Sequence, residues 1–182
     1  MRIISGVYRG KKLLSPDSKN VRPTSDRTRE AIFNILHSKL SSSLSDFSLL
    51  DVFSGSGAFS LEAISRGIKN VGLIDIDTRD ALKNIALFPK EKDKIKIMKL
   101  NALNLPVACS AYDLLFMDAP YNKGLSEKAL QQLSEKGWLS KNALCIIETE
   151  RNENINIPDN FEQLDERIYG LAKIIFLNYK GN

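Results

Sequence analysis

Four residues between positions 49 and 77 have the types and the spacing of a nucleotide-type pocket. Gly55 and Gly57 stand in the short turn SGSG, and Asp51 precedes them. Asp75 lies 20 positions after Gly55, at the end of the next apolar run. Glycines let the backbone approach a ligand closely, and an acid at the tip of the next strand can receive ribose hydroxyls. The stretch therefore predicts a pocket for a nucleotide-like ligand.

The residues around the glycines discriminate between such ligands. A dinucleotide fingerprint has a third glycine three positions after Gly57, and Ser60 stands there instead. The acid Asp51 would repel a pyrophosphate, but it suits a ligand with an ammonium group. S-adenosylmethionine, a methyl donor, has an ammonium group and also a carboxylate that backbone amides can bind. The sequence therefore favours S-adenosylmethionine over a nicotinamide dinucleotide.

A second candidate site, Asp118-Ala119-Pro120-Tyr121, follows another apolar run. It fits methyl transfer to an exocyclic amino group of a nucleobase, whose lone pair is delocalised into the ring. The Asp118 carboxylate and the Ala119 carbonyl can accept the two N–H groups, which favours a pyramidal nitrogen. Tyr121 can stack on a base swung out of its helix or loop. Alone, this sequence is more often a plain turn, but beside the first motif the functional interpretation is favoured.

The elements that must position these residues alternate between strand and helix. Apolar residues predict five strands, at 49–53, 71–74, 95–100, 112–117 and 143–148, of which the third alternates with lysines. Helices are predicted to begin after Ser25, a good N-cap, and to cover 59–66, 79–88 and 124–133. Gly170 predicts a terminal antiparallel hairpin. The pattern is typical of an α/β domain with an open, mostly parallel sheet of about seven strands and helices on both faces.

Residues 1–22 are predicted to form a small basic β-hairpin ahead of a main domain at 23–182. Residues 1–39 carry a net charge of +6, whereas the remainder carries −2. This asymmetry suggests a polyanionic partner such as nucleic acid; an ordinary solvated basic face is the alternative. Arginines beside Tyr8 can follow phosphates while the ring stacks on a base.

The composition excludes several other classes of protein. No run of about 18 apolar residues exists, so no membrane span is predicted. The N-terminus lacks an apolar signal core, so we expect a cytoplasmic protein. Cys109 and Cys145 match no metal-site spacing, and His37 is the only histidine. We therefore expect no metal site and no histidine-based catalysis.

The motifs together resemble a known class of enzymes. DVFSGSG followed by DAPY resembles the amino-directed class I methyltransferases of nucleic acids. MRIISGVYRGKKL and VRPTSDRTREAIFNIL are similar to the bacterial 16S ribosomal RNA guanine-N2 methyltransferases, the RsmD family. The resemblance extends over essentially the whole chain. It implies a Rossmann-like class I methyltransferase fold and methyl transfer from S-adenosylmethionine to N2 of a guanine in 16S rRNA, within the small ribosomal subunit or its precursor.

The resemblance also implies site residues. The cofactor set runs from the methionine end to the adenine edge and comprises Asp51, Phe53, Ser54, Gly55, Gly57, Asp75, Ile76, Asp77, Asn101, Ala102 and Asp118. The residues that act on guanine would be Asp118, Ala119, Pro120 and Tyr121. The residues facing RNA would be Arg2, Tyr8, Arg9, Lys11, Lys12, Arg22, Thr24, Arg27 and Arg29. The last four match the family's basic motif and would position RNA or close over the cofactor.

One position departs from the family pattern. The family usually has proline where this chain has Ala119. Alanine keeps the carbonyl but loses the ring that fixes φ, and Pro120 still biases Ala119 toward extended conformations. We expect a working loop that is slightly less rigid.

Other functions remain alternatives at this stage. The same acceptor chemistry serves a methyltransferase acting on DNA adenine or on a protein glutamine. A non-catalytic RNA-binding module on a degenerate nucleotide-type fold is a further alternative. A nicotinamide oxidoreductase is disfavoured, because the third glycine is missing and no constellation for hydride transfer is visible.

Overall fold

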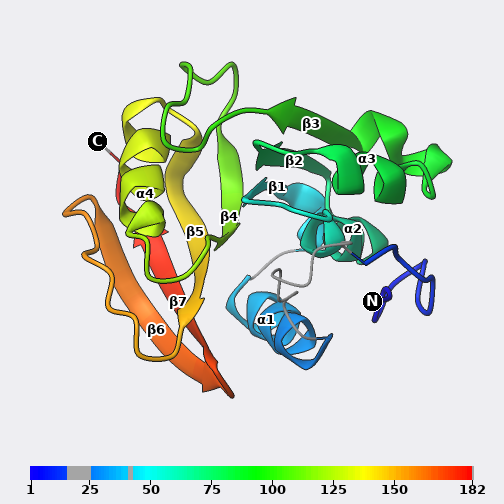
Figure 1. Cartoon of the computed structure of the whole chain (residues 1–182), viewed down its shortest axis with the longest axis horizontal. Coiled ribbons are helices and arrows are strands. Elements are labelled where there is room, and N and C mark those ends of the chain that lie inside the picture. Colours follow the sequence, from blue (N-terminus) through cyan, green and yellow to red (C-terminus); the bar gives the residue numbers. More distant parts are fainter. Residues whose placement is uncertain (16–25, 41–42, 182) are drawn as a thin grey trace.

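The protein is built around one seven-stranded sheet, seen in a computed structural model that describes residues 1–15, 26–40 and 43–181 (Figure 1). The strand order is β3-β2-β1-β4-β5-β7-β6. The strands are β1 (Ser48–Val52), β2 (Asn70–Asp75), β3 (Ile95–Lys99), β4 (Tyr112–Asp118), β5 (Leu139–Glu150), β6 (Phe161–Tyr169) and β7 (Ala172–Tyr179). The first five are parallel, and β7 is antiparallel to β5 and β6. The predicted mostly parallel sheet with a terminal hairpin is confirmed.

Helices cover both faces of this sheet, as predicted (Figure 1). They are α1 (Asp26–Lys39), α2 (Ala58–Ser65), α3 (Arg79–Ile85) and α4 (Leu125–Glu135), with short 3-10 helices η1 (Leu44–Asp46) and η2 (Pro89–Lys94). Apolar side chains of α1, α2 and α3 pack on one face of the sheet, and those of α4 pack on the other. On the first face Phe59 stacks between Phe33 and Phe116, with ring centroids 4.8 and 3.6 Å away. No described helix is long and apolar enough to cross a membrane.

The N-terminal segment, residues 1–15, forms a ribbon that is less regular than the predicted β-hairpin. One antiparallel bridge, between Arg2 and Lys12, replaces two strands. The ribbon nevertheless shares a core with the main domain, because Ile3 and Leu13 are buried in a cluster with α2 and Phe88. We refer to residues 1–15 as the N-terminal ribbon. The predicted domain boundary between 22 and 23 lies outside the described residues.

The order of the strands places a crevice at the carboxyl ends of β1 and β4. The chain leaves β1 toward β2 on one side and later returns to β4 on the other, and ligands bind at such switch points. Val52 of β1 is in register with Ile74 of β2 and with Met117 of β4. The residues that follow them, Phe53, Asp75 and Asp118, therefore lie side by side. We call this line of strand ends the carboxyl edge; it holds both motifs found in the sequence.

Candidate cofactor and acceptor site

The turn between β1 and α2 has a backbone conformation that few residues tolerate. Phe53, Gly55 and Gly57 all have positive φ, at 60°, 51° and 72°. A Cβ at Gly57 would lie 3.0 Å from a methyl group of Leu73, so a larger residue there would also make the Leu73 side chain shift. Phe53 is not a glycine, and holding it in the left-handed region costs of order 1 kcal/mol. Such conformations concentrate at ligand sites, which marks this glycine turn as a binding element.

Asp75, at the tip of β2, ties the glycine turn to the neighbouring strand. One oxygen of its carboxylate accepts the N–H of Gly55 at 2.8 Å, and the other accepts the N–H of Asp77 at 2.9 Å. A carboxylate has about four lone-pair sites, so two remain for other donors such as ribose hydroxyls. Asp75 thus fixes the turn and remains able to bind a ligand.

The two residues after Asp75 have different roles. Ile76 is an apolar side chain that is 68% exposed at the carboxyl edge, where it can cover one face of a flat ring. Asp77 instead pairs with Arg79, whose Nε lies 2.9 Å from Oδ1, and these hydrogen bonds hold the pKa of Asp77 well below its usual range. The Asp77 carboxylate is therefore engaged at the start of α3.

Asp51 is a buried acid on the face of the sheet that α2 covers. Ser60 of α2 donates its hydroxyl to Oδ2 of Asp51 at 2.7 Å and its backbone N–H at 3.3 Å. Burial raises the pKa of Asp51 to about 7, and the nearby charge of Asp75 adds to the shift. A cationic ligand group would favour the ionised form. Ser60, noted in the sequence as a missing glycine, is thus the hydrogen-bonding partner of Asp51.

The side-chain oxygen of Ser54 is buried and has no hydrogen-bond partner among the described residues. Its Oγ is one of the few buried side-chain oxygens in the described residues that makes no hydrogen bond. A buried hydroxyl left unsatisfied costs about 1–3 kcal/mol, and a ligand seated on the glycine turn would relieve that cost. Together with Asp51 and the turn, Ser54 fits the amino-acid end of a ligand that has both an ammonium and a carboxylate group.

The predicted adenine edge also lies at this end of the sheet. The N–H of Leu100 donates to the carbonyl of Asp75 at 3.1 Å, which joins the end of β3 to the tip of β2. Asn101 is exposed, and its Oδ1 accepts the N–H of Leu103 at 3.0 Å. Ala102 is buried in the same cluster as Val52. The structure therefore brings the predicted cofactor residues together along the carboxyl edge.

The acceptor loop begins where β4 ends. Asp118 is half-buried, Ala119 is buried and Pro120 is exposed. Tyr121 is half-buried, and its hydroxyl donates to Oε1 of Glu148 at 3.3 Å. Glu148 is a buried acid of β5 in register with Asp118, so two carboxylates stand next to each other. The sequence analysis missed Glu148; an acid inside the buried run CIIETE was the available signal.

The sequence of this chain is similar to those of known proteins. A family model described as conserved hypothetical protein 95 matches residues 1–178. The ribosomal RNA small subunit methyltransferase D of Haemophilus influenzae is 34% identical, over 94% of this chain and 90% of the relative. The protein of the same name from Escherichia coli is 35% identical, over 93% of this chain and 85% of the relative. This chain belongs to the RsmD family.

Solved structures agree with the RsmD assignment. The Escherichia coli protein yhhF superimposes with a TM-score of 0.85 at 32% identity, covering all of this chain and 99% of that chain. A SAM-dependent methyltransferase from Aquifex aeolicus gives a TM-score of 0.60 at 16% identity, covering 81% of this chain and 88% of that chain. At that identity the likeness concerns the fold alone, and the Rossmann-like class I methyltransferase fold predicted from the sequence is confirmed.

The RNA-facing residues expected of an RsmD protein separate into exposed and engaged groups. Exposed cations of the predicted set are Arg2, Arg9, Lys12 and Arg27. Tyr8 is not the exposed aromatic that the sequence suggested, because its ring packs edge-on against Phe88, with centroids 5.0 Å apart, and its hydroxyl donates to Glu91. Lys11 donates to the carbonyl of Leu87 and lies over the Phe88 ring. Tyr8 and Lys11 therefore attach the ribbon to η2 and to the residues just before it.

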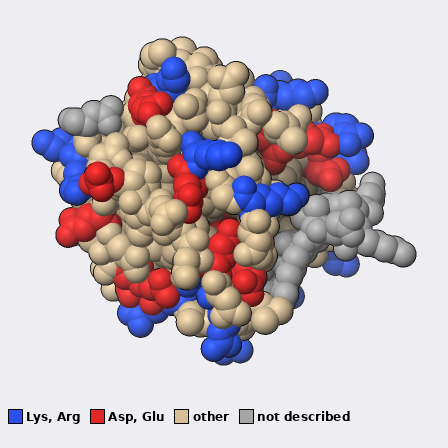
Figure 2. Space-filling model, turned by 60° about the vertical axis from the view of Figure 1, so that its left-hand side comes forward, with Lys and Arg blue, Asp and Glu red and all other residues tan. Residues whose placement is uncertain are grey.

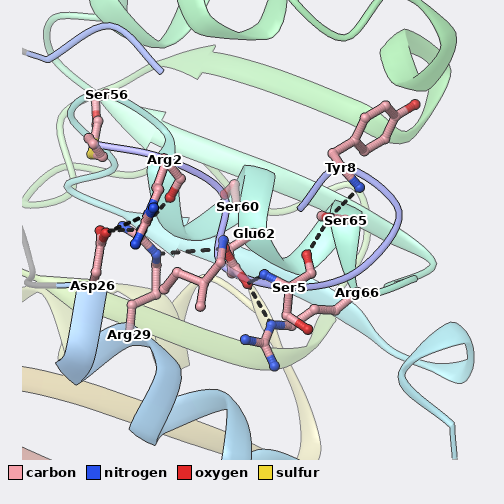
Figure 3. A network of polar contacts seen from close by, with 12 residues as sticks. Arg2, Ser5, Tyr8, Asp26, Arg29, Ser56, Ser60, Glu62, Ser65 and Arg66 are labelled. Atoms are coloured by element: carbon pink, nitrogen blue, oxygen red, sulfur yellow. Dashed lines mark hydrogen bonds and ion pairs between the residues drawn. The ribbon is translucent and has the colours of Figure 1, made fainter. Parts of the chain in front are cut away.

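The prediction that Arg29 faces RNA is wrong. Its side chain is only 1% exposed, so it is not presented on the surface. It donates to the carbonyl of Arg2 at 2.7 Å and to Asp26 at 2.9 Å, and its Nε lies 3.9 Å from Glu62 (Figure 3). Burial lowers the pKa of Arg29, and the acids Asp26 and Glu62 oppose that shift. Arg29 thus holds the ribbon in place. The predicted contacts of Arg22 and Thr24 lie outside the described residues.

Proposed function

We propose that this protein transfers a methyl group from S-adenosylmethionine to the exocyclic N2 of a guanine in 16S ribosomal RNA. Its relatives are named as small-subunit rRNA methyltransferases, which supports the reaction class and the type of substrate. The observation that carries the proposal is the register of the sheet, which sets Phe53 between Asp75 and Asp118. The pocket for the methyl donor and the loop suited to an amino group therefore lie next to each other at the carboxyl edge of the sheet.

The residues of the carboxyl edge fit S-adenosylmethionine. Asp51 would bind the ammonium group, and the hydroxyl of Ser54 with the amides of the glycine turn would bind the carboxylate. Asp75 would receive the ribose hydroxyls, and Ile76 would cover the adenine. When bound, this cofactor supplies a methyl group on a positively charged sulfur, which makes that group electrophilic. The protein's task is to hold a nucleophile in line with it, and such positioning can account for much of the rate.

The acceptor loop would prepare the nucleophile. The Asp118 carboxylate and the Ala119 carbonyl accept the two N–H groups of the guanine amine, which turns the nitrogen lone pair toward the methyl group. Tyr121 stacks on the base, and its bond to Glu148 holds the ring at the mouth of the site. No covalent bond to the protein is needed, because the amine would attack the methyl carbon directly. The carbon–sulfur bond would break as the carbon–nitrogen bond forms, S-adenosylhomocysteine would leave, and the methylated nitrogen would then release one proton to solvent. Both cysteines lie outside this set of residues, and burial raises the pKa of the Cys145 thiol.

The charge of the surface supports an RNA substrate. Arg9 and Lys12 are exposed on the ribbon, and the bond from Tyr8 to Glu91 brings them close to the exposed Lys90 and Lys92 of η2. On the side that carries α4 and β6, acidic and basic side chains are interspersed (Figure 2). The ribbon contains no acid, whereas η2 mixes lysines with Glu91 and Asp93, so the ribbon is the part of this surface best suited to phosphates.

Methyl transfer from tritium-labelled S-adenosylmethionine tests the proposal. Naked 16S rRNA and small-subunit particles lacking this modification are offered separately, and nucleosides from the product are analysed by mass spectrometry. We expect N2-methylguanine. N6-methyladenine in DNA, or label in a protein glutamine, would support the alternative acceptors instead. Failure to bind the cofactor in titration calorimetry would support a non-catalytic RNA-binding module. We expect the reaction to take place in the cytoplasm, on the small ribosomal subunit or its precursor.

A further inference from the structure

Asn84 is a buried polar residue that the chemistry above does not use. It lies on α3, is fully buried, and uses every hydrogen-bonding group of its side-chain amide. Its Oδ1 accepts the N–H of Leu14 at 2.7 Å, and its Nδ2 donates to the carbonyl of Leu14 at 3.1 Å and to the carbonyl of Ser56 at 3.0 Å. The amide can have only this orientation, because one partner is a donor and two are acceptors.

These three bonds join two functional segments. Leu14 belongs to the N-terminal ribbon, and Ser56 stands between the two glycines of the glycine turn. The other end of the ribbon meets the same residue, since the Ser56 hydroxyl lies 3.9 Å from the sulfur of Met1. Both ends of the ribbon therefore reach the turn that would bind the methionine end of the cofactor, Leu14 through Asn84 and Met1 through a weak contact with Ser56.

A second buried residue fastens the middle of the ribbon to α2. Glu62 accepts the N–H of Ile4 at 2.7 Å and that of Ser5 at 3.0 Å, and it pairs with Arg66 at 2.7 Å (Figure 3). The helix that carries Glu62 starts at the glycine turn and also carries Ser60, the partner of Asp51. Any shift of the ribbon against α2 or α3 would therefore disturb residues of the cofactor site.

We propose that Asn84 is a positioning residue that couples the N-terminal ribbon to the glycine turn, so that the cofactor and rRNA bind cooperatively. A ligand that fixes the turn stabilises the seated ribbon through the bonds from Asn84 to Ser56 and Leu14. By reciprocity, RNA that binds the seated ribbon stabilises the turn and raises cofactor affinity by the same factor. The RNA half of this inference rests on the proposed function, whereas the coupling of cofactor to ribbon does not.

Hydrogen exchange of the ribbon amides, with and without saturating S-adenosylhomocysteine, tests the coupling without RNA and without turnover. In the wild-type protein we expect the ligand to slow exchange at Leu14 and Ile4 by about fivefold or more, the lower end of typical coupling. In Asn84→Ala the ligand should change these rates less than twofold. Equal ligand protection in wild type and variant, or no protection in the wild type, would overturn the proposal.

Two further variants separate coupling from loss of stability. Asn84→Asp has nearly the same shape and can still accept the Leu14 N–H, but it cannot donate to Ser56 or Leu14, so we expect it to lose coupling as the alanine variant does. Ser48→Ala is the matched control, because it removes a hydrogen bond of 2.7 Å to Asp113 near the opposite end of β1. In Ser48→Ala, S-adenosylhomocysteine should still slow exchange of the ribbon amides as in the wild type. If it does not, the result for Asn84→Ala reflects general destabilisation and the proposal fails.

Binding of labelled 16S rRNA completes the test. In the wild type, S-adenosylhomocysteine should tighten rRNA binding by about fivefold or more, and in Asn84→Ala it should not. If rRNA binds and is methylated but the ligand leaves its affinity unchanged, the inference fails while the proposed function stands. If the ligand protects the ribbon but rRNA neither binds nor is methylated, the proposed function fails while the internal coupling stands.

Discussion

The two halves of the carboxyl edge are organised differently. In the donor half, at the ends of β1 and β2, each carboxylate is already oriented: Asp75 by Gly55 at 2.8 Å and Asp51 by Ser60 at 2.7 Å. The acceptor half comprises Asp118, Tyr121 and Glu148, and its loop reaches the surface at 120 and 122–123. A preorganised half suits a small diffusing cofactor, whereas an accessible half suits a base that arrives attached to a large RNA. Changes to the donor half should therefore alter affinity for the cofactor, and changes to the acceptor half should alter rate.

The largest expected effect is that of Asp118→Ala in the acceptor half. The variant should lower the rate of methyl transfer by about 100-fold or more, because misplacing a reacting group by about 1 Å already costs that much. Affinity for S-adenosylmethionine should change by less than about threefold, since Asp75 and the glycine turn remain. Tritium transfer and titration calorimetry measure the two quantities. A normally folded Asp118→Ala protein with undiminished transfer would refute the assigned role.

Asp75→Ala should produce the reverse pattern. Losing hydrogen bonds to a charged group costs about 1.5–3 kcal/mol, so we expect affinity for S-adenosylmethionine to fall by about tenfold or more. At saturating cofactor the rate should recover most of its wild-type value. Calorimetry followed by transfer assays at increasing cofactor concentration gives both values. If only the saturated rate fell, the functional division between the two halves would be wrong.

The protonation of Asp51 should make cofactor binding depend on pH. Burial raises the pKa of Asp51 from 3.8 to about 7, and only the ionised form attracts an ammonium group. Affinity should therefore fall as the pH drops below about 7 and level off above it, until the ammonium group itself titrates near pH 8. Asp51→Asn should bind more weakly at pH 7.5 and show little change between about pH 6 and pH 7.5. Calorimetry across this range tests the expectation, and a wild-type affinity independent of pH would contradict it.

The same pKa shift has an opposite effect on folding. The folded protein holds the Asp51 proton more tightly than the unfolded chain does, so this group makes the free energy of unfolding decrease as the pH rises from about 4 to about 7. Asp51→Asn should flatten that part of the stability profile. Denaturation at several pH values, with Asp46→Asn at an exposed carboxylate as the control, separates this effect from the general charge of the protein.

The smallest expected effect concerns Ala119. Ala119→Pro would restore the ring that fixes φ, and it leaves the carbonyl that accepts an N–H of the base. We expect a rise in turnover of less than about threefold and slower hydrogen exchange in the loop at 121–124, with cofactor affinity unchanged. If neither turnover nor loop order increased, the loop would already be as rigid as it needs to be.

Some features were predictable from the sequence because they depend on local pattern. The run at 49–53 and the acid 20 positions after Gly55 identified the strand ends and hence the carboxyl edge. The buried polar residues that hold the N-terminal ribbon were not predictable, because their partners are distant along the chain. Glu62 bonds Ile4 across 58 positions, and Asn84 bonds Leu14 across 70. Arg29 looked like one more exposed cation of a basic segment, and only the seated ribbon explains its burial.

Alongside its buried side chains, the ribbon is held on the domain through its own backbone. Glu62 binds the amides of Ile4 and Ser5, Asn84 binds both backbone groups of Leu14, and a Cβ at Gly6 would lie 1.8 Å from the carbonyl of Ser65. Such a seat accepts many different outward-facing side chains, provided that Gly6 is kept. The outer surface of the ribbon can therefore be redesigned for a different RNA without altering the attachment that serves the cofactor site.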